Sequence, residues 1–139
     1  MNALWISRIA EYIHTQKALH TAQKIIFIKT KAQNSLLQHF HIPTRTQNKI
    51  FFTKDTQELL LKEARHAKYF WSQYKKLLPQ WVNFPERIQH GYDISNKLLD
   101  IGYHHLTGIV KSICRQKDIS TVIGLLHVAH STDSEPLVY

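Results

Sequence analysis

Cysteine, glycine and proline are all scarce in this chain of 139 residues, with one cysteine and four each of glycine and proline. The single thiol, Cys114, cannot form an internal disulfide or a cysteine-based zinc site, and it fits a reducing, cytoplasmic setting. Its place on a helical stripe predicts burial rather than nucleophilic chemistry. The low glycine and proline content favours long helices over a turn-rich β fold.

Long apolar runs are also missing. No segment approaches the roughly 18 residues that a membrane span needs, so no membrane association is expected. The N-terminus, MNALW, has no basic segment followed by an apolar run and is not typical of a signal peptide. The sequence contains no glycine-rich phosphate loop and no G-x-S-x-G, which removes two common signatures of catalysis.

Acidic residues are outnumbered, with 10 against 18 lysines and arginines, for a net charge of +8 and a pI near 9.7. A basic globular chain suggests nucleic acid or an anionic surface as partner, although charge alone fits a merely basic protein equally well. The apolar fraction of 43% is ordinary for a folded protein. The length corresponds to a single domain over residues 1–139, with enough chain to bury a core.

Apolar residues recur at helical spacing along most of the chain. We therefore expect an all-α fold, a bundle of about five helices, over residues 2–14, 16–39, 53–78, 93–116 and 120–127. Two connectors, 40–52 and 79–92, carry the prolines that interrupt this period, and Trp81 and Phe84 of the second are expected to fold back onto the helices. The ending STDSEPLVY has the signals of a helix start and then stops at Tyr139. This suggests that the natural protein continues, and the alternative is a short tail that rests on the core.

The helix expected over 53–78 organises the others. Its stripe is formed by apolar residues three and four positions apart: Leu60, Ala64, Ala67, Trp71, Tyr74 and Leu78. Thr53 is expected as the N-cap, and Pro79 ends the helix. Glu63 lies beside the stripe, either as a solvated flank residue or as a ligand aimed into a groove. The spacing alone favours the flank.

The helix expected over 93–116 begins at a natural cap, Asp93. Its stripe comprises Ile94, Leu98, Ile101, Leu106 (or His105), Ile109 and Ile113. Gly102 in mid-helix costs about 1 kcal/mol relative to alanine, which predicts close approach of another backbone at this position.

Chemistry is most plausible at Glu63, His127 and the C-terminal tail. Imidazole and carboxylates from separate segments can hold Mg²⁺ or Mn²⁺ and leave coordination positions for phosphate and water. The other histidine pairs lack matching ligands at useful spacing, and His127 with His130 would supply only one pair. Most of the ten histidines are expected to be surface or partly buried residues.

Four patches, in order and at compatible spacing, give the chain a family resemblance. Lys29, Gln33, Leu36 and Leu37 fit a K-x-x-x-Q-x-x-L-L helix, and residues 63–71, EARHAKYFW, fit E-G-x-x-A-x-x-Y-[WF] with Ala64 in place of the usual glycine. Residues 93–103, DISNKLLDIGY, fit D-x-x-N-x-x-L-x-x-G-Y. Residues 123–127, IGLLH, and 136–139, PLVY, fit the I-G-F-L-H stretch and the approach to D-L-x-E. Together they resemble the helical C-terminal domain of the CRISPR-associated adaptation endonuclease/integrase family, over nearly the whole chain.

The resemblance implies a site and a set of contacts. Glu63 and His127 would be catalytic and would bind a divalent metal, Mg²⁺ or Mn²⁺, with a third ligand, an aspartate, expected just beyond Tyr139. Basic side chains would neutralise DNA phosphates, and by charge and position we assign this role to Lys29, Lys31, Arg65 and Lys68. Asn96 either lines the site or makes a helix-packing hydrogen bond.

The implied activity is spacer acquisition in prokaryotic antiviral defence. A DNA 3′-hydroxyl attacks a target phosphodiester and joins a new spacer to the CRISPR repeat array, and with water as nucleophile the same site cuts DNA. The family's partners are DNA (spacer precursor and repeat), a second copy in a homodimer, and a companion adaptation nuclease. The family's N-terminal β-rich domain has no counterpart here, so we expect a chain truncated at both ends and impaired in activity.

Two other interpretations remain open. The chain could be a non-catalytic basic helical module that binds DNA or a protein partner, with salt-dependent DNA binding and no metal requirement. It could also be a decayed gene remnant without function, for which marginal stability would be expected.

Overall fold

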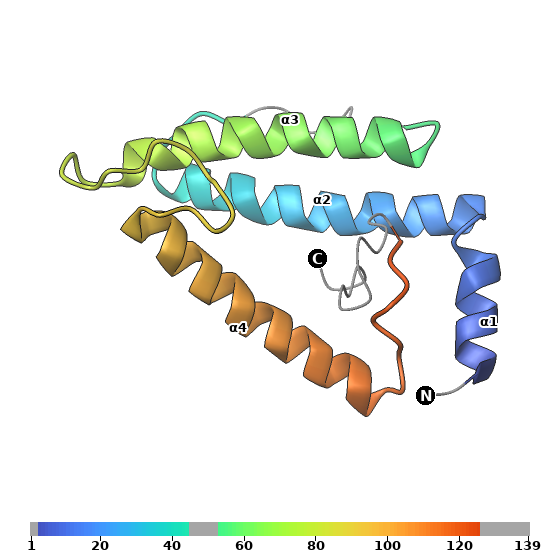
Figure 1. Cartoon of the computed structure of the whole chain (residues 1–139). Coiled ribbons are helices and arrows are strands. Elements are labelled where there is room, and N and C mark those ends of the chain that lie inside the picture. Colours follow the sequence, from blue (N-terminus) through green and yellow to red (C-terminus); the bar gives the residue numbers. More distant parts are fainter. Residues whose placement is uncertain (1–2, 45–52, 126–139) are drawn as a thin grey trace. The chain divides into compact units, whose positions relative to one another are not determined.

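The computed structural model describes residues 3–44 and 53–125, and all regular secondary structure within these ranges is helical (Figure 1). Its elements are α1 (Ala3–Tyr12), α2 (Gln16–His39), α3 (Thr56–Tyr74), the 3-10 turn η1 (Lys75–Leu77) and α4 (Ile94–Gln116). The predicted all-α class is therefore confirmed, and α2 has the limits that the sequence indicated.

The short helix expected over 120–127 is wrong where the structure describes it, because residues 120–125 form bends without a helical turn. Its sequence explains the difference. Thr121, Val122 and Ile123 are successive β-branched residues, and Gly124 follows them. All four have low helix propensity, and a helix of eight residues cannot offset the cost of nucleation without strong packing.

The chain divides into two compact units. One comprises Gln23–Gly102, and the other comprises Met1–Ala22 with Tyr103–Tyr139. The unit Gln23–Gly102 holds six of the residues to which the sequence assigned a role: Lys29, Lys31, Glu63, Arg65, Lys68 and Asn96. A single domain over residues 1–139 stays a prediction.

Within the unit Gln23–Gly102, α2 and α3 run in the same direction (Figure 1). Three contacts fix this parallel arrangement from one end to the other. The Gln23 side-chain amide donates to the Thr53 hydroxyl at 3.0 Å, just before α3 begins. Lys29 meets Glu63 midway, and the Tyr69 hydroxyl donates to the Pro43 carbonyl at 2.7 Å beyond the end of α2.

The N-terminus of α3 differs from the sequence expectation. Asp55, not Thr53, is the N-cap, and its Oδ1 accepts from the Glu58 backbone N–H at 2.8 Å. The Glu58 carboxylate in turn accepts from the Lys54 N–H at 2.9 Å, so two unpaired donors are satisfied reciprocally. Thr53 is buried instead, in its contact with Gln23. The N-cap of α3 thus lies two residues later than the sequence indicated.

The second connector folds back onto α3 through one aromatic residue only. Phe84 is buried at 2% exposure and packs against Trp71 and Tyr74, with ring centroids 6.1 and 6.0 Å apart. Trp81 is 85% exposed, so the expectation that it also folds back is wrong. Phe84 thus joins an aromatic cluster on α3 that also includes Phe70.

Asp93 caps helix α4 as expected, because its carboxylate accepts from the Asn96 N–H at 2.9 Å. Its apolar stripe, however, is exposed along its whole length: Ile94, Leu98, Ile101, Leu106, Ile109 and Ile113 are each 48% exposed or more. A Cβ built on Gly102 would meet no other atom of the described chain within 4 Å. Within residues 3–44 and 53–125, the predicted close approach of another backbone to Gly102 is therefore wrong.

In the unit formed by Met1–Ala22 and Tyr103–Tyr139, hydrogen bonds of Tyr12 join the end of α1 to the start of α2. The Tyr12 hydroxyl donates to the Lys17 carbonyl at 3.1 Å and pairs with the Thr21 hydroxyl at 2.7 Å. Ala18 and Ala22 are buried on the first turns of α2. Cys114 is buried on α4, as predicted, although the apolar stripe of that helix is exposed. No helix in the described ranges is both long enough and apolar enough to cross a bilayer.

Candidate functional site

Glu63 belongs to the inward face of α3. The residues of this helix that are buried are Leu59, His66 and Phe70. Glu63 lies four residues after Leu59 and three before His66, so it shares their side of the helix. Its side chain is only 18% exposed. The flank position that its spacing favoured is therefore wrong, because the buried face of α3 is displaced from the stripe that begins at Leu60.

The carboxylate of Glu63 is paired with the ammonium of Lys29. Lys29 Nζ donates to Glu63 Oε1 at 2.5 Å, which joins α2 to α3 across 34 residues of sequence. The lysine side chain is 47% exposed, so the pair is shielded at its acidic end and open to solvent at its basic end. Ammonium–carboxylate contacts of this kind are charge-assisted and short.

One turn along α2 from Lys29 lies a buried acceptor without a partner. Gln33 Oε1 is shielded from solvent and has no hydrogen bond to any described residue. Residues four apart lie on the same face of a helix, so this oxygen is on the side of α2 that carries Lys29. A cation, a water molecule or an ammonium group placed there would satisfy it.

The other basic residues of the predicted DNA contact are exposed: Lys31 on α2, and Arg65 and Lys68 on α3. A helix turns by about 100° per residue, so Lys31 lies roughly 200° around α2 from Lys29. Arg65 lies equally far around α3 from Glu63. The structure thus brings Lys29 to the carboxylate, and it distributes the other three cations over outward faces.

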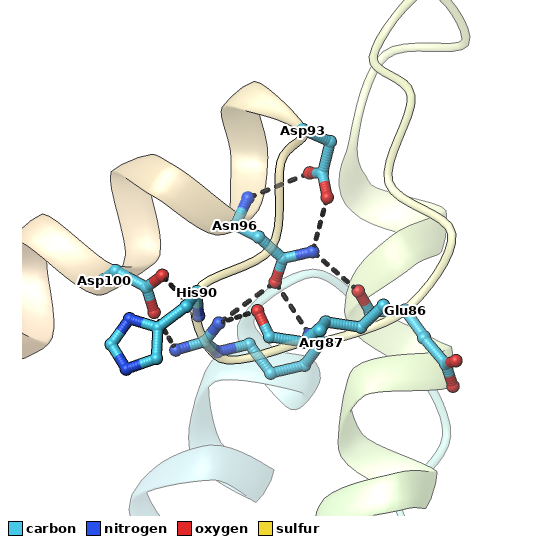
Figure 2. Close-up of polar contacts among 7 residues, drawn as sticks. Glu86, Arg87, His90, Asp93, Asn96 and Asp100 are labelled. Carbon is cyan, nitrogen blue, oxygen red and sulfur yellow. Dashed lines mark hydrogen bonds and ion pairs between the residues drawn. The ribbon is translucent and has the colours of Figure 1, made fainter.

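Asn96 is the centre of a polar network at the start of α4 (Figure 2). It is fully buried, and every polar atom of its side chain is engaged. Its Oδ1 accepts from the Ile88 N–H at 2.9 Å and from Arg87 at 3.1 Å, and its Nδ2 donates to the Glu86 carbonyl at 2.9 Å and to Asp93 at 2.7 Å. These contacts give Asn96 a structural role in holding residues 86–88, and a role in lining a reaction site stays a prediction.

Arg87, His90 and Asp100 belong to this network, and the sequence analysis assigned none of them a role. Arg87 donates to Asp100 Oδ1 at 2.5 Å, and the His90 backbone N–H donates to Asp100 Oδ2 at 2.8 Å. Asp93, Asn96 and Asp100 are spaced by three and four residues, which places them on one face of α4. The sequence shows this polar spacing, but the sequence analysis described the helix by its apolar stripe, which lies on the opposite side.

The carboxylates of the network titrate below their ordinary range. The hydrogen bond from Arg87 lowers the pKa of Asp100, and the side-chain and backbone donors of Asn96 lower the pKa of Asp93. On α3, the hydrogen bond from Lys62 and that from the Lys54 N–H lower the pKa of Glu58. All three groups thus favour their charged forms in the folded protein.

The metal set implied by the resemblance is only partly within the described residues. Glu63 is placed, whereas His127 and His130 lie outside them. In the ranges 3–44 and 53–125, no three histidine, cysteine or acidic side chains are grouped so that they could hold a metal ion. The structure therefore places one of the two predicted ligands, and it sets a lysine beside it.

These features define an all-α fold with a shielded carboxylate between two parallel helices, in a chain with a strongly basic overall charge. The chain belongs to the CRISPR associated protein Cas1 family, whose family model matches residues 2–139.

Two individual proteins are similar to this chain, one in sequence and one in fold. Over 86 residues, or 60% of this chain, the sequence is 33% identical to CRISPR-associated endonuclease Cas1 1 of Saccharolobus solfataricus, and the match covers 24% of that protein. The fold is similar to that of a casposase solved bound to its integration product, with a TM-score of 0.79 and 24% identity. That match covers 100% of this chain and 43% of the casposase chain. The chain thus spans less than half the length of either protein.

Proposed function

We propose that this chain is the helical catalytic part of a CRISPR-adaptation integrase/endonuclease, which joins spacer DNA to the repeat array and can also cut DNA. The observation that carries the proposal is the position of Glu63. A carboxylate on the inward face of a helix, 18% exposed and already in contact with a cation, is suited to binding a metal ion. Family membership and the net charge of +8 support the choice of DNA as substrate.

The residues present fit a divalent metal. Glu63 supplies a hard carboxylate oxygen, and the contact of its Oε1 with Lys29 indicates that a positive charge is favourable at that oxygen. Gln33 Oε1, one turn along α2 from Lys29, is a further hard oxygen that has no hydrogen-bond partner among the described residues. Glu63 and His127 would hold the ion, Mg²⁺ or Mn²⁺. When bound, such an ion lowers the pKa of a coordinated hydroxyl and stabilises charge that develops on the phosphate.

The chain's own residues would position the DNA. Lys31, Arg65 and Lys68 are exposed cations on α2 and α3, where they can neutralise backbone phosphates without competing for Glu63. Lys29 lies beside the carboxylate and can meet a phosphate brought there. The DNA partners we propose are a spacer precursor and the CRISPR repeat, with a second copy of the chain and the companion adaptation nuclease as protein partners.

A strand-transfer and cleavage assay tests the proposal. Wild type and Glu63→Gln are incubated with a labelled repeat duplex and a 3′-hydroxyl DNA end, in Mn²⁺ or in EDTA. We expect joining or nicking by the wild type in Mn²⁺ only, loss of both in Glu63→Gln, and unchanged DNA binding in the variant. Activity that survives the substitution would contradict the assignment of Glu63. DNA binding with no Mn²⁺-dependent chemistry would favour the non-catalytic basic module instead.

A further inference from the structure

Lys29 stands in an unexpected place for a residue whose predicted role was contact with DNA. Its ammonium touches Glu63 Oε1, the atom to which a metal ion would bind under the function proposed above. This pair differs from that of Glu58 and Lys62, which are one turn apart on the same helix. It joins two helices, and it uses the carboxylate on the inward face of α3.

We propose that the Lys29 ammonium occupies the cation position on Glu63 when no divalent ion is bound, and that a divalent ion must displace it. The inference rests on the proposed function, because it assumes that Glu63 is a metal ligand. It adds a positioning residue on α2 that holds the carboxylate in place, keeps its charge compensated and lowers the apparent affinity for the metal.

The geometry supports displacement over a permanent bond. The lysine side chain is 47% exposed and the glutamate 18%, so the ammonium can leave into solvent while the carboxylate stays where it is. The ammonium is carried on a flexible stem of four methylenes, and it can move away without any change in the backbone of α2. A half-exposed ion pair contributes little, so a divalent ion with twice the charge can replace it.

The displaced ammonium has a nearby acceptor. Gln33 Oε1 lies one turn along the same face of α2 and is buried without a partner among the described residues. Residues four apart on a helix are close enough for a lysine to reach a glutamine side chain. The helix thus offers a second position for the positive charge of Lys29.

Mn²⁺ titration of the whole chain tests this inference, by calorimetry at constant ionic strength, with no DNA present. The variants are Lys29→Met, Lys29→Arg, Lys31→Met and Glu63→Gln. Lys31 is the control, because it is an exposed lysine two residues along the same helix and its removal changes the net charge equally. Far-UV circular dichroism confirms that each variant is folded.

We expect Lys29→Met to bind Mn²⁺ about two- to fivefold more tightly than wild type, the range that a half-exposed ion pair can contribute. Lys31→Met should stay within about twofold of wild type because it is not paired with Glu63, and Lys29→Arg should restore wild-type affinity. Equal affinities for Lys29→Met and Lys31→Met, or weaker binding by Lys29→Met, would overturn the inference.

The Glu63→Gln variant separates this inference from the function on which it rests. Loss of Mn²⁺ binding in Glu63→Gln with no effect of Lys29→Met leaves Glu63 as a ligand and removes only the role of Lys29. Unchanged Mn²⁺ binding in Glu63→Gln removes the metal site itself. Failure of both the wild type and Lys29→Met to bind Mn²⁺ overturns both proposals.

Discussion

At the scale of single residues, burial and partner decide what a polar side chain does. Asn96 and Glu63 are both shielded polar groups in the unit Gln23–Gly102, but their surroundings differ. Asn96 has all its polar atoms satisfied by backbone and side chains of residues 86–93, so it contributes to stability. Glu63 is paired with a flexible cation, Lys29, as its one partner in the described part of the chain, so it can exchange that partner for another.

The substitution Asn96→Ala tests the structural role of Asn96. The substitution leaves the Ile88 N–H and the Glu86 carbonyl without their Asn96 partner in a part-buried network. It also removes one acceptor of Arg87, which keeps Asp100 and the Ile88 carbonyl. We expect the free energy of unfolding to fall by about 2–3 kcal/mol, measured by urea denaturation. Asn83→Ala, at an exposed position of the same connector, is the control and should change it by less than about 0.5 kcal/mol. An equal effect of both would show that the network does not stabilise the fold.

At the scale of elements, α4 is attached by its polar face. Its first turns present Asp93, Asn96 and Asp100 to residues 86–90 (Figure 2). Its apolar stripe, in contrast, is exposed. The attachment also needs a glycine. A Cβ on Gly91 would lie 2.9 Å from the Cβ of Asn96 and 3.1 Å from the Ile88 carbonyl oxygen, closer than side chains normally approach.

Two glycine substitutions should therefore change the stability of the fold in opposite directions. Gly91→Ala forces the connector away from Asn96, and we expect thermal unfolding at a lower temperature. Gly102→Ala meets no atom of the described chain within 4 Å and removes a flexible residue from a helix interior. It should raise the free energy of unfolding by about 0.5–1 kcal/mol. Destabilisation by Gly102→Ala would indicate a close contact at that position after all.

The network at α4 should also respond to acid. The folded-state pKa of Asp100 is lowered by Arg87, so the ionised form is favoured by folding. That contribution is present above the ordinary pKa of aspartate, near 4, and is lost as the pH falls through the lowered value. We expect Asp100→Asn to unfold with a weaker pH dependence than wild type below about pH 4.

Denaturant titrations at several pH values measure this effect. Asp118→Asn provides the control. Asp118 is exposed, and its backbone has φ of 54°, which asparagine tolerates well. Asp118→Asn and Asp100→Asn could weaken the pH dependence of the free energy of unfolding equally. That result would show that the cause is the loss of any one negative charge and not the loss of the Arg87 contact.

At the scale of the whole molecule, positive charge is the dominant feature. The net charge of +8 is carried partly by exposed residues on α2 and α3, which face away from the pair of Lys29 and Glu63. Binding of DNA by such a surface releases counterions, so it weakens as salt is added. The number of phosphates contacted sets the slope of log affinity against log salt concentration.

We expect Lys31→Gln, Arg65→Gln and Lys68→Gln each to reduce by about one the slope of log affinity for duplex DNA against log salt. Fluorescence anisotropy at several salt concentrations measures the slope. Lys97→Gln, an exposed lysine on α4 outside the proposed contact, should leave it unchanged. The same reduction in Lys97→Gln would mean that charge acts in general and that these positions form no defined contact.

The sequence by itself determined the helical class, the limits of α2, the cap of α4 and the family, because each depends on local spacing or on an ordered set of motifs. It named Glu63 as a candidate ligand without deciding whether that side chain faces inward. Only the tertiary structure decided this, together with the pairing of Glu63 with Lys29 and the exposure of the α4 stripe. The physical reason is that helical periodicity sets the angles between side chains around one axis. Which side meets a neighbour depends on contacts between residues far apart in the chain.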